Sequence, residues 1–359
     1  ATFNGDAYFW GATFNGDAYF WGATFNGDAN FRDATFTNVA NFWGATFNRD
    51  AYFWDATFNG DANFQGATFT NVANFRGATL NDANFQDATL NDGANFQDAT
   101  LNDADFQDAT FTNDADFQGA TLTNGANFQD ATFTNDADFQ DATFTNGANF
   151  RGATLNDANF RGATFNRYAY FRGATFNRAN FQGATFNDAN FQDATFNRYA
   201  DFQDATFNGA GFQGATLNDA NFRGATFNRY AYFRGATFNR ANFQGATFND
   251  ANFQDATFNR YADFQDATFN GAGFQGATLN DANFQGATFN RANFQDATFN
   301  GANFRGATFN RANFRGATFN RYAYFRGATF TRSAPPKGLP PEQVDEDGLP
   351  HGARWADAD

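Results

Sequence analysis

A five-residue period runs from Ala1 to Arg332 and constrains the fold more than any other feature of the sequence. Successive units such as ATFNG, AYFWG and ANFQD begin with Ala and carry Phe or Leu at the third position. All 56 Phe residues occupy these third positions, and Leu fills the few that remain. Because a period of five drifts around an α-helix and holds no single face, the pattern excludes an amphipathic helix.

The alternation within each unit predicts a β-strand. Ala and Phe stand two residues apart and point to one side of an extended segment, while Thr, Asn, Gln or Arg point to the other side. A single unit buries only two side chains, so it must stack on neighbours that carry the same pattern. Coiling of the chain supplies those neighbours, and it predicts an all-β solenoid with Ala and Phe inside.

The repeated unit, with Ala first, Thr, Asn or Asp second and Phe or Leu third, resembles the motif of the pentapeptide-repeat family. This resemblance implies a right-handed, quadrilateral parallel β-helix with four units per turn. We therefore expect residues 1–332 to form one β-helical domain of about sixteen turns, a rod of roughly 75 Å at the ~4.8 Å spacing of strands.

Two features of the sequence itself also indicate four units per turn. Single extra residues, such as Asp6, Asp50 and Tyr168, always follow ATF or ATL units, which places them at two opposite corners where a bulge leaves the core ladders in place. Residues 153–214 and 215–276 are identical, and each copy holds twelve units, or three turns of four. The duplication therefore preserves the face on which each unit lies.

The formal net charge of −15 is unevenly distributed. Residues 1–152 carry 20 Asp and four Arg, whereas residues 153–332 carry 17 Arg and 12 Asp. Only the first part is strongly acidic, and the mixture of signs in the later part favours a solvated surface over a nucleic-acid-binding one. We expect no direct binding of nucleic acid.

Catalytic chemistry finds little support in the sequence. The chain has no Cys, and Ser333 and His351 both lie in its final segment. Nucleophilic catalysis needs a nucleophile, a base and an orienting group in contact, and no insertion in the repeat is long enough to build a pocket. We expect no enzymatic activity, no catalytic residue, no cofactor, no metal site and no small-molecule substrate, and we interpret the Asp residues as solvated.

Outward aromatic residues of the first turns are the candidate partner-binding residues. Four units per turn place Trp21 above Trp43 on one face and Trp10, Arg32 and Trp54 in a file on the opposite face, where a cation-π stack is expected. Stabilisation of the ladders alone is the alternative. The full candidate set is Tyr8, Trp10, Tyr19, Trp21, Arg32, Trp43, Tyr52 and Trp54.

These observations favour a non-enzymatic scaffold that binds an unidentified protein through its outward faces. The alternative comes from the resemblance: the quinolone-resistance members imply a DNA mimic that binds DNA gyrase or topoisomerase, here through the acidic N-terminal half. The projecting loops and C-terminal dimerisation helix of those members have no counterpart in this sequence. The candidate acidic face comprises Asp82, Asp87, Asp92, Asp98, Asp103, Asp105, Asp108, Asp114 and Asp116.

Residues 333–359 form a different kind of segment, which holds all five Pro residues. We expect a Pro-rich, acidic, disordered tail, with a folded cap that uses Leu349 and Trp355 as the alternative. No run of 18 apolar residues predicts a membrane span. The lack of Cys fits a cytoplasmic location without requiring it, and open turn edges at the N-terminal end favour association into a homo-oligomer.

Overall fold

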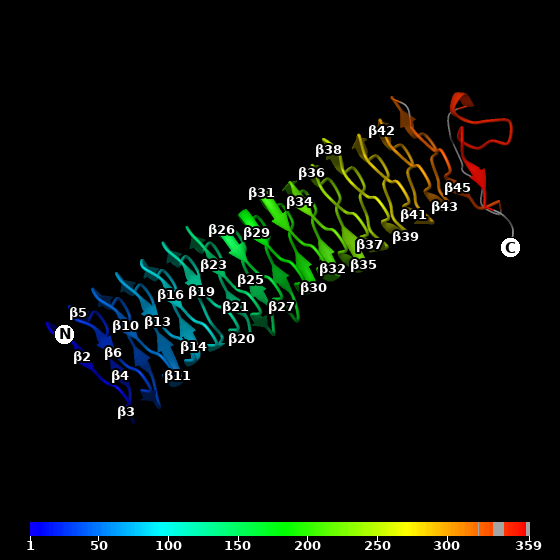
Figure 1. The fold of residues 1–359 in the computed structure, drawn as a ribbon. Coiled ribbons are helices and arrows are strands. Elements are labelled where there is room, and N and C mark those ends of the chain that lie inside the picture. The colour runs from blue at the N-terminus through cyan, green and yellow to red at the C-terminus, as the bar shows by residue number, and fades with distance from the viewer. Residues whose placement is uncertain (322, 333–340, 357–359) are drawn as a thin grey trace. The chain divides into compact units, whose positions relative to one another are not determined.

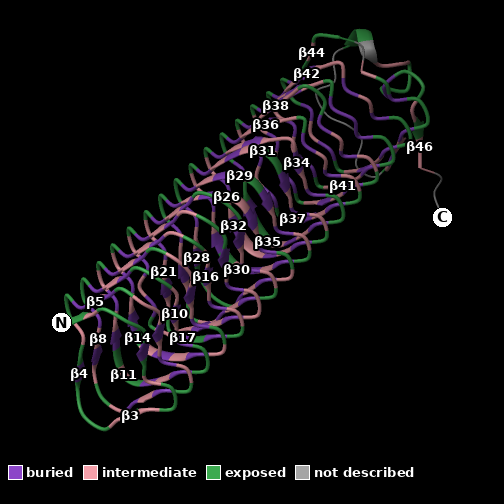
Figure 2. Cartoon of the chain, turned by 60° about the vertical axis from the view of Figure 1, so that its left-hand side comes forward, coloured by how far each residue is buried: buried purple, intermediate pink, exposed green. Residues whose placement is uncertain are grey.

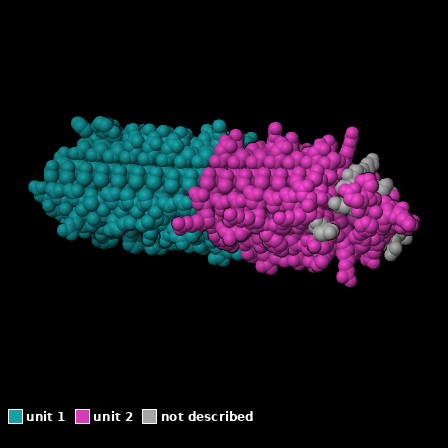
Figure 3. Space-filling model, turned by 90° about the horizontal axis from the view of Figure 1, so that it is seen from above, with its two compact units in different colours: residues 1–185 teal, residues 186–359 magenta. Residues whose placement is uncertain are grey.

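A computed structural model describes residues 1–321, 323–332 and 341–356. The chain divides into two compact units, residues 1–185 and residues 186–359 (Figure 3). Each unit is a four-sided parallel β-helix wound from the five-residue repeat (Figure 1), and the turns of the two units together number about 16. The predicted fold class is therefore confirmed.

The pairing between turns of unit 1 fixes the number of repeats per turn. Thr2 pairs with Thr24, Ala7 with Ala29, Thr13 with Thr35 and Ala18 with Ala40, so equivalent residues lie 22 positions apart. Later turns without extra residues shorten this spacing, as in unit 2, where Thr237 pairs with Thr257. Four five-residue repeats therefore make one turn of 20 residues, and the extra residues account for the longer spacing of 22.

The strands of unit 1 belong to two parallel sheets, which we call sheet A and sheet B. In sheet A they are β1 (Thr2–Phe3), β2 (Ala7–Tyr8), β5 (Thr24–Phe25), β6 (Ala29–Asn30), β9 (Thr46–Phe47), β10 (Ala51–Tyr52), β12 (Thr68–Phe69), β13 (Ala73–Asn74), β15 (Thr89–Leu90), β16 (Ala94–Asn95), β18 (Thr110–Phe111), β19 (Ala115–Asp116), β22 (Thr132–Phe133), β23 (Ala137–Asp138), β26 (Thr154–Asn159) and β29 (Thr175–Asn180). In sheet B they are β3 (Thr13–Phe14), β4 (Ala18–Tyr19), β7 (Thr35–Phe36), β8 (Ala40–Asn41), β11 (Thr57–Asn63), β14 (Thr79–Asn84), β17 (Thr100–Asn102), β20 (Thr121–Thr123), β21 (Ala126–Asn127), β24 (Thr143–Phe144), β25 (Ala148–Asn149), β27 (Thr164–Phe165) and β28 (Ala169–Tyr170).

The strands of unit 2 alternate in the same way. Those of sheet A are β31 (Thr195–Asp201), β33 (Thr216–Asn218), β34 (Ala220–Asn221), β36 (Thr237–Asn239), β38 (Thr257–Asn259), β40 (Thr278–Asn280), β42 (Thr298–Asn300) and β44 (Thr318–Phe319). Those of sheet B are β30 (Thr185–Asn190), β32 (Thr206–Gly211), β35 (Thr226–Tyr232), β37 (Thr247–Asn249), β39 (Thr268–Asn270), β41 (Thr288–Asn290), β43 (Thr308–Asn310), β45 (Thr329–Phe330) and β46 (Arg354–Trp355).

Stacked phenylalanine rings fill the interior of each unit. Figure 2 marks the buried residues in purple, and they recur along the turns. Phe31, for example, stacks on Phe53 with ring centroids 5.0 Å apart, and it meets Phe42 edge to face at 5.4 Å. Both arrangements are favourable for aromatic pairs. The inward Ala residues are buried beside the rings, so the predicted core of Ala and Phe is confirmed.

The corners of the β-helix are of two kinds. At one kind, the carbonyl of Phe9 accepts a hydrogen bond from the backbone N–H of Ala12 across a tight turn in which Gly11 has φ of +64°. Asp occupies the equivalent position in many turns, as at Asp87, because a short polar side chain tolerates this left-handed conformation. The other kind receives the extra residues: the register between β11 and β14 shifts around the inserted Asp61, which confirms the predicted bulge.

The C-terminal segment differs from the expected disordered tail over residues 341–356. A 3-10 helix, η1 (Pro341–Gln343), precedes β46, and β46 pairs in parallel with β45 so that Trp355 lies opposite Phe330. Leu349 is buried, and the backbone N–H of Ala356 donates to the carbonyl of Phe330. An open strand edge offers unpaired hydrogen-bonding groups, and this segment satisfies them. Residues 333–340 and 357–359 lie outside the described residues.

Across the residues that the structure describes, no helix is long and apolar enough to cross a membrane.

Candidate functional site

The outward aromatic side chains of the first turns lie in Ala-Tyr strands of the two sheets of unit 1 and at the tight corners that follow these strands. Tyr8 and Tyr19 follow Ala in β2 and β4, and they are 71% and 63% exposed. Trp10 and Trp21 lie at the tight corners that follow these strands, with 72% and 61% exposed. Six of the rings are large and exposed, and exposed aromatic rings that lie near one another often mark an interaction surface. Their exposed fractions range from 39% to 72% for Tyr8, Trp10, Tyr19, Trp21, Trp43 and Trp54.

The predicted file of Trp10, Arg32 and Trp54 is present at one corner. Backbone hydrogen bonds link the turns in this order, from the N–H of Gly11 to the carbonyl of Arg32 and from the N–H of Asp33 to the carbonyl of Trp54. The guanidinium of Arg32 lies 5.3 Å from the ring centroid of Trp54, so this cation-π contact is confirmed.

Trp10 does not complete the cation-π stack by the same interaction. Its indole N–H donates to the carboxylate of Asp33 at 2.8 Å. Two residues that the sequence prediction left out of the stack contribute instead: the guanidinium of Arg32 lies 4.6 Å from the ring of Tyr52, and that of Arg76 lies 5.9 Å from the ring of Trp54. Arg76 lies one turn after Trp54 in the sequence, and this spacing could have identified the contact between them.

The second file places Trp21 and Trp43 at the opposite tight corner. The backbone N–H of Gly22 donates to the carbonyl of Trp43, which sets the two residues on adjacent turns. Trp43 is 52% exposed. The structure therefore brings together the two predicted aromatic files within the first turns, each on a backbone fixed by ladder hydrogen bonds.

The extra Asp residues hold the neighbouring Tyr side chains in place. The hydroxyl of Tyr8 donates to Asp6 at 3.0 Å, that of Tyr19 to Asp17 at 2.9 Å, and that of Tyr52 to Asp50 at 2.8 Å. Each hydrogen bond to a carboxylate raises the pKa of the tyrosine above its ordinary value, since ionisation would place two negative charges together. These rings are thus neutral, oriented groups.

The nine candidate acidic residues do not form one face. They follow the chain at intervals of about a quarter turn, so they occupy all four corners and two faces of unit 1. Five of them have a left-handed backbone, which explains Asp at these positions by turn geometry: Asp82, Asp87, Asp98, Asp103 and Asp108. Asp105 accepts hydrogen bonds from the backbone of Gln107 and the side chain of Asn127.

Asp116, a member of this set, is partly buried and lies next to another carboxylate, and both circumstances alter its ionisation. Partial burial, followed by the negative charges of Asp138 and Asp98, raises the pKa of Asp116 above its ordinary value, against a lowering by the N–H of Gln118 and by Arg76. Asp116 and Asp138 pair directly across β19 and β23. Like charges placed opposite each other destabilise a sheet.

Replacing Asp138 by asparagine is expected to stabilise unit 1 at neutral pH by about 0.5 kcal/mol. Because the raised pKa of Asp116 means that the folded state binds a proton more tightly than the unfolded state, stability falls as pH rises through that pKa. The gain of Asp138→Asn should therefore be present at pH 7 and vanish below pH ~3. Denaturant unfolding at both pH values measures it, and an equal gain at both would contradict the electrostatic cause.

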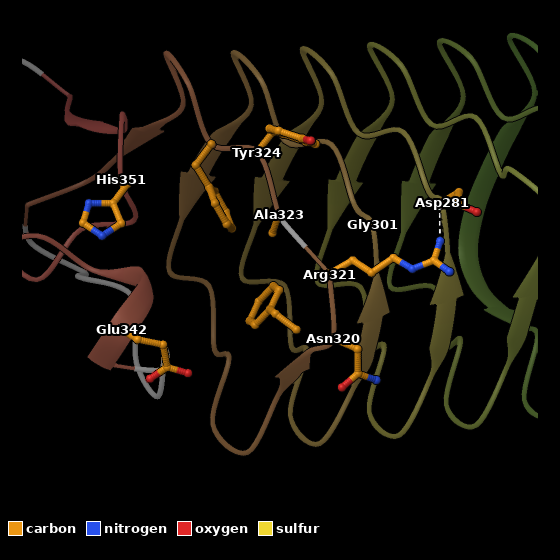
Figure 4. A pocket seen from close by; sticks show the side chains of 10 residues that line it. Asp281, Gly301, Asn320, Arg321, Ala323, Tyr324, Glu342 and His351 are labelled. Carbon is orange, nitrogen blue, oxygen red and sulfur yellow. Dashed lines mark ion pairs between the residues drawn. The ribbon is translucent and has the colours of Figure 1, made fainter.

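A hollow of about 900 Å³ lies in unit 2, where the C-terminal segment meets the last repeats (Figure 4). Arg321 reaches toward Asp281, with 3.8 Å between Nη1 and the carboxylate oxygen, and His351 and Glu342 enter from the C-terminal segment. The prediction that the repeat builds no pocket did not foresee this hollow, whose second wall is not repeat sequence. It also did not foresee a smaller hollow of about 470 Å³ in unit 1, which is lined by repeat residues such as Asp61, Asp82 and Asp103. In the described part of the chain, no three His, Cys, Asp or Glu residues gather as a metal site would require.

The repeat is matched by a family model described as pentapeptide repeats in nine copies, over overlapping segments that run from residue 9 to residue 334. No curated protein matches the sequence. Among solved structures, HetL from the cyanobacterium Nostoc, a pentapeptide-repeat protein involved in regulating heterocyst differentiation, is 20% identical with a TM-score of 0.22, and the match covers 67% of this chain and 92% of HetL.

Two further solved structures are similar to parts of the chain. QnrB1, a plasmid-mediated fluoroquinolone resistance protein, is 18% identical with a TM-score of 0.25, over 60% of this chain and 89% of QnrB1. A pentapeptide-repeat protein of the Arabidopsis thaliana thylakoid lumen is 32% identical with a TM-score of 0.20, over 27% of this chain and 66% of that protein. TM-scores of 0.20 to 0.25 do not indicate a shared function. The family match, which spans nearly the whole repeat, does decide the family: the chain belongs to the pentapeptide-repeat proteins.

Proposed function

We propose that this chain is a non-catalytic interaction scaffold that binds a protein partner through the outward aromatic residues of its first turns. The observation that carries the proposal is the concentration of exposed Trp and Tyr side chains between Tyr8 and Trp54. Trp and Tyr are the residues that most often dominate the energy of protein interfaces.

The geometry of these side chains supports binding because they are already ordered. The hydroxyls of Tyr8 and Tyr19 are tied to Asp6 and Asp17, and the indole of Trp10 is tied to Asp33. Their backbones belong to a continuous ladder. A partner would therefore lose little free energy in fixing these rings, which is the advantage of a preorganised surface.

A pair of matched variants tests the proposal. Trp21→Ser/Trp43→Ser removes two rings that are 61% and 52% exposed, whereas Tyr230→Ser/Tyr261→Ser removes two rings in unit 2 that are 60% and 52% exposed. Immobilised wild-type chain and both variants are used to capture proteins from an extract of the source cells, and the captured partner is then titrated. We expect the Trp variant to weaken binding at least tenfold and the Tyr variant to leave it unchanged, while equal retention by all three proteins would refute the proposal.

Intrinsic fluorescence gives an independent readout on the purified partner. Four of the five Trp residues lie in the first turns, and the fifth is Trp355. In a Trp355→Phe background, the emission reports on the proposed surface alone. Binding there should shift the emission to shorter wavelength as water is excluded, and an unchanged spectrum in a formed complex would place the contact elsewhere.

A DNA mimic that binds DNA gyrase is the second candidate, and the observation in its favour is the winding of the nine candidate Asp residues around unit 1. A charge that follows the winding of the chain presents carboxylates on every side, as a duplex presents phosphates. The likeness to QnrB1 adds no support of its own.

Three Asp residues with left-handed backbones allow a matched test of the DNA mimic. Asp87→Asn, Asp98→Asn and Asp108→Asn are combined in one variant, and Asp204→Asn, Asp255→Asn and Asp266→Asn form the control with the same backbone conformation and charge change. In a gyrase supercoiling assay, mimicry predicts inhibition by wild type and control and at least tenfold weaker inhibition by the first variant. No inhibition by wild type at high micromolar concentration would remove this candidate.

A further inference from the structure

The last repeats of unit 2 carry a concentration of positive charge that the described residues leave almost without carboxylate partners. Residues 286–332, which we call the basic segment, contain seven Arg and one Asp. All seven side chains are exposed. Among the residues that the structure describes, only Arg321 of this segment lies within ion-pair distance of a carboxylate, that of Asp281 at 3.8 Å.

Two Arg residues outside the basic segment show what a neutralised corner looks like. The guanidinium of Arg178 meets Asp157 on the preceding turn at 2.6 Å, and that of Arg240 meets Asp219 at 2.8 Å. All four residues lie at the fifth position of their units, where the backbone is left-handed for both partners. The repeat therefore places Arg and Asp in register when both are present.

The basic segment instead places Arg against Arg. The backbone N–H of Arg291 donates to the carbonyl of Asn310, which puts Arg291 and Arg311 at the same corner of adjacent turns. At another corner, the N–H of Gly306 donates to the carbonyl of Arg326, one turn after Arg305. Like charges in register destabilise a sheet, so internal stability does not account for these two pairs.

The acidic part of unit 1 shows the opposite imbalance. Residues 1–152, which we call the acidic segment, carry 20 Asp against four Arg. Asp116 and Asp138 pair in register on adjacent turns of this segment. They place two negative charges together, just as Arg291 and Arg311 place two positive charges together in unit 2. A guanidinium presents a planar fork of N–H donors that matches a carboxylate, so the two segments are chemically complementary.

From this complementarity we infer that the basic segment is a docking surface for the acidic segment of a second copy of the chain. If the acidic segment of each copy meets the basic segment of the other, the contact is made twice and the assembly closes as a dimer. A phosphate backbone would offer similar anions. The net charge of −15 repels both nucleic acid and a second copy at long range, but only a second copy also brings a basic segment that can meet the acidic segment in return.

Sedimentation velocity with the full chain, from 1 to 200 μM in 50 mM and 500 mM NaCl, tests the inference. Association is expected to increase with concentration at 50 mM NaCl and to weaken at least tenfold at 500 mM, where the screening length falls below roughly 5 Å. Association independent of salt, or a monomer at every concentration, would overturn the inference.

Two double variants with the same charge change distinguish docking at the basic segment from a general effect of net charge on association. Arg291→Asn/Arg311→Asn should weaken association at 50 mM NaCl at least tenfold. Arg178→Asn/Arg240→Asn alters the same backbone position at corners that already have an Asp partner, so it should leave association unchanged. Asn is tolerated at such corners, as at Asn124, and equal effects of the two variants would refute docking at the basic segment.

A 20-nucleotide single-stranded DNA added at 50 mM NaCl tests whether the basic segment binds a phosphate backbone instead. The inference predicts that the oligonucleotide does not compete with self-association of the wild-type chain. Tight binding of the oligonucleotide that the Arg291→Asn/Arg311→Asn variant loses, without self-association of the wild type, would instead make the basic segment a nucleic-acid surface.

Discussion

Replacing Phe53 by alanine is expected to destabilise its turn of unit 1 by about 3–5 kcal/mol, the range for a fully buried aromatic residue. Phe53 is stacked between Phe31 and Phe75, with ring centroids 5.0 and 4.7 Å away, and it meets Phe42 and Phe64 edge to face. Its side chain is fully buried. Alanine would leave a cavity between two stacked neighbours that the ladder hydrogen bonds hold at a fixed spacing.

Leucine at the same position provides the matched control. Leu80 occupies the inward third position of an ATL repeat on a different face and is also fully buried, so the core accepts leucine at an inward position. We expect Phe53→Leu to cost about 1 kcal/mol, since most of the apolar volume remains. A similar loss for both variants would show that ring stacking, rather than filled volume, stabilises the core.

Hydrogen exchange is the measurement that localises the effect. Each turn of a solenoid contacts only its neighbours, so a cavity weakens two interfaces and can open the β-helix there without unfolding the rest. The amide of Phe53 donates to the carbonyl of Asn74 and reports on one of these interfaces. Its protection should fall in Phe53→Ala, and an unchanged exchange rate would contradict the predicted cavity.

The winding of the chain was readable from the sequence because it depends on a repeated local rule. Ala and Phe two residues apart define the inward side of every strand, and the position of extra residues such as Asp61 after ATF units identifies the corners that bulge. The structure has both features, in the register of Thr2 with Thr24 and in the shift between β11 and β14. Each turn of a solenoid contacts only the turns beside it, so the repeat period itself determines which strand pairs with which.

Contacts between turns could be predicted from the sequence only where the residues that lie one turn apart were identified correctly. The pairing of Arg32 with Trp54 followed from the spacing of one turn, but the choice of Trp10 between Arg32 and Asp33 depends on side-chain geometry that spacing does not determine. The segment with η1 and β46 was harder still. Its sequence lacks the repeat, and its order comes from the strand edge of β45, which composition does not record.

Gly60 and Gly16 have the same local sequence, but only Gly60 has a described turn on its N-terminal side. Both stand before an extra Asp in the sequence ATFNGDA, and both lie at the same corner of unit 1, two turns apart. Gly16 lies in the first turn of unit 1, where no described turn adjoins it on the N-terminal side, and a Cβ atom there would meet nothing within 4 Å. A Cβ atom on Gly60 would lie 2.6 Å from the carbonyl carbon of Asn38 on the turn between them.

Gly60→Ala is therefore expected to destabilise unit 1 by about 1–3 kcal/mol, because the obstructing atoms are backbone and the two turns must separate. Gly16→Ala should change stability by less than about 0.5 kcal/mol or raise it slightly, since alanine restricts the unfolded chain. The amide of Thr57, which donates to the carbonyl of Ala34, lies between the same two turns as Gly60 and Asn38.

Hydrogen exchange at Thr57 and denaturant unfolding distinguish the two variants. Faster exchange at Thr57 in Gly60→Ala, with the amide of Ala18 unaffected in Gly16→Ala, would confirm that close approach between turns, and not the turn sequence, requires glycine at position 60. Equal effects of the two substitutions would mean that the corner itself demands glycine. In that case the cause would be local, and the close backbone contact with Asn38 would relax at little cost.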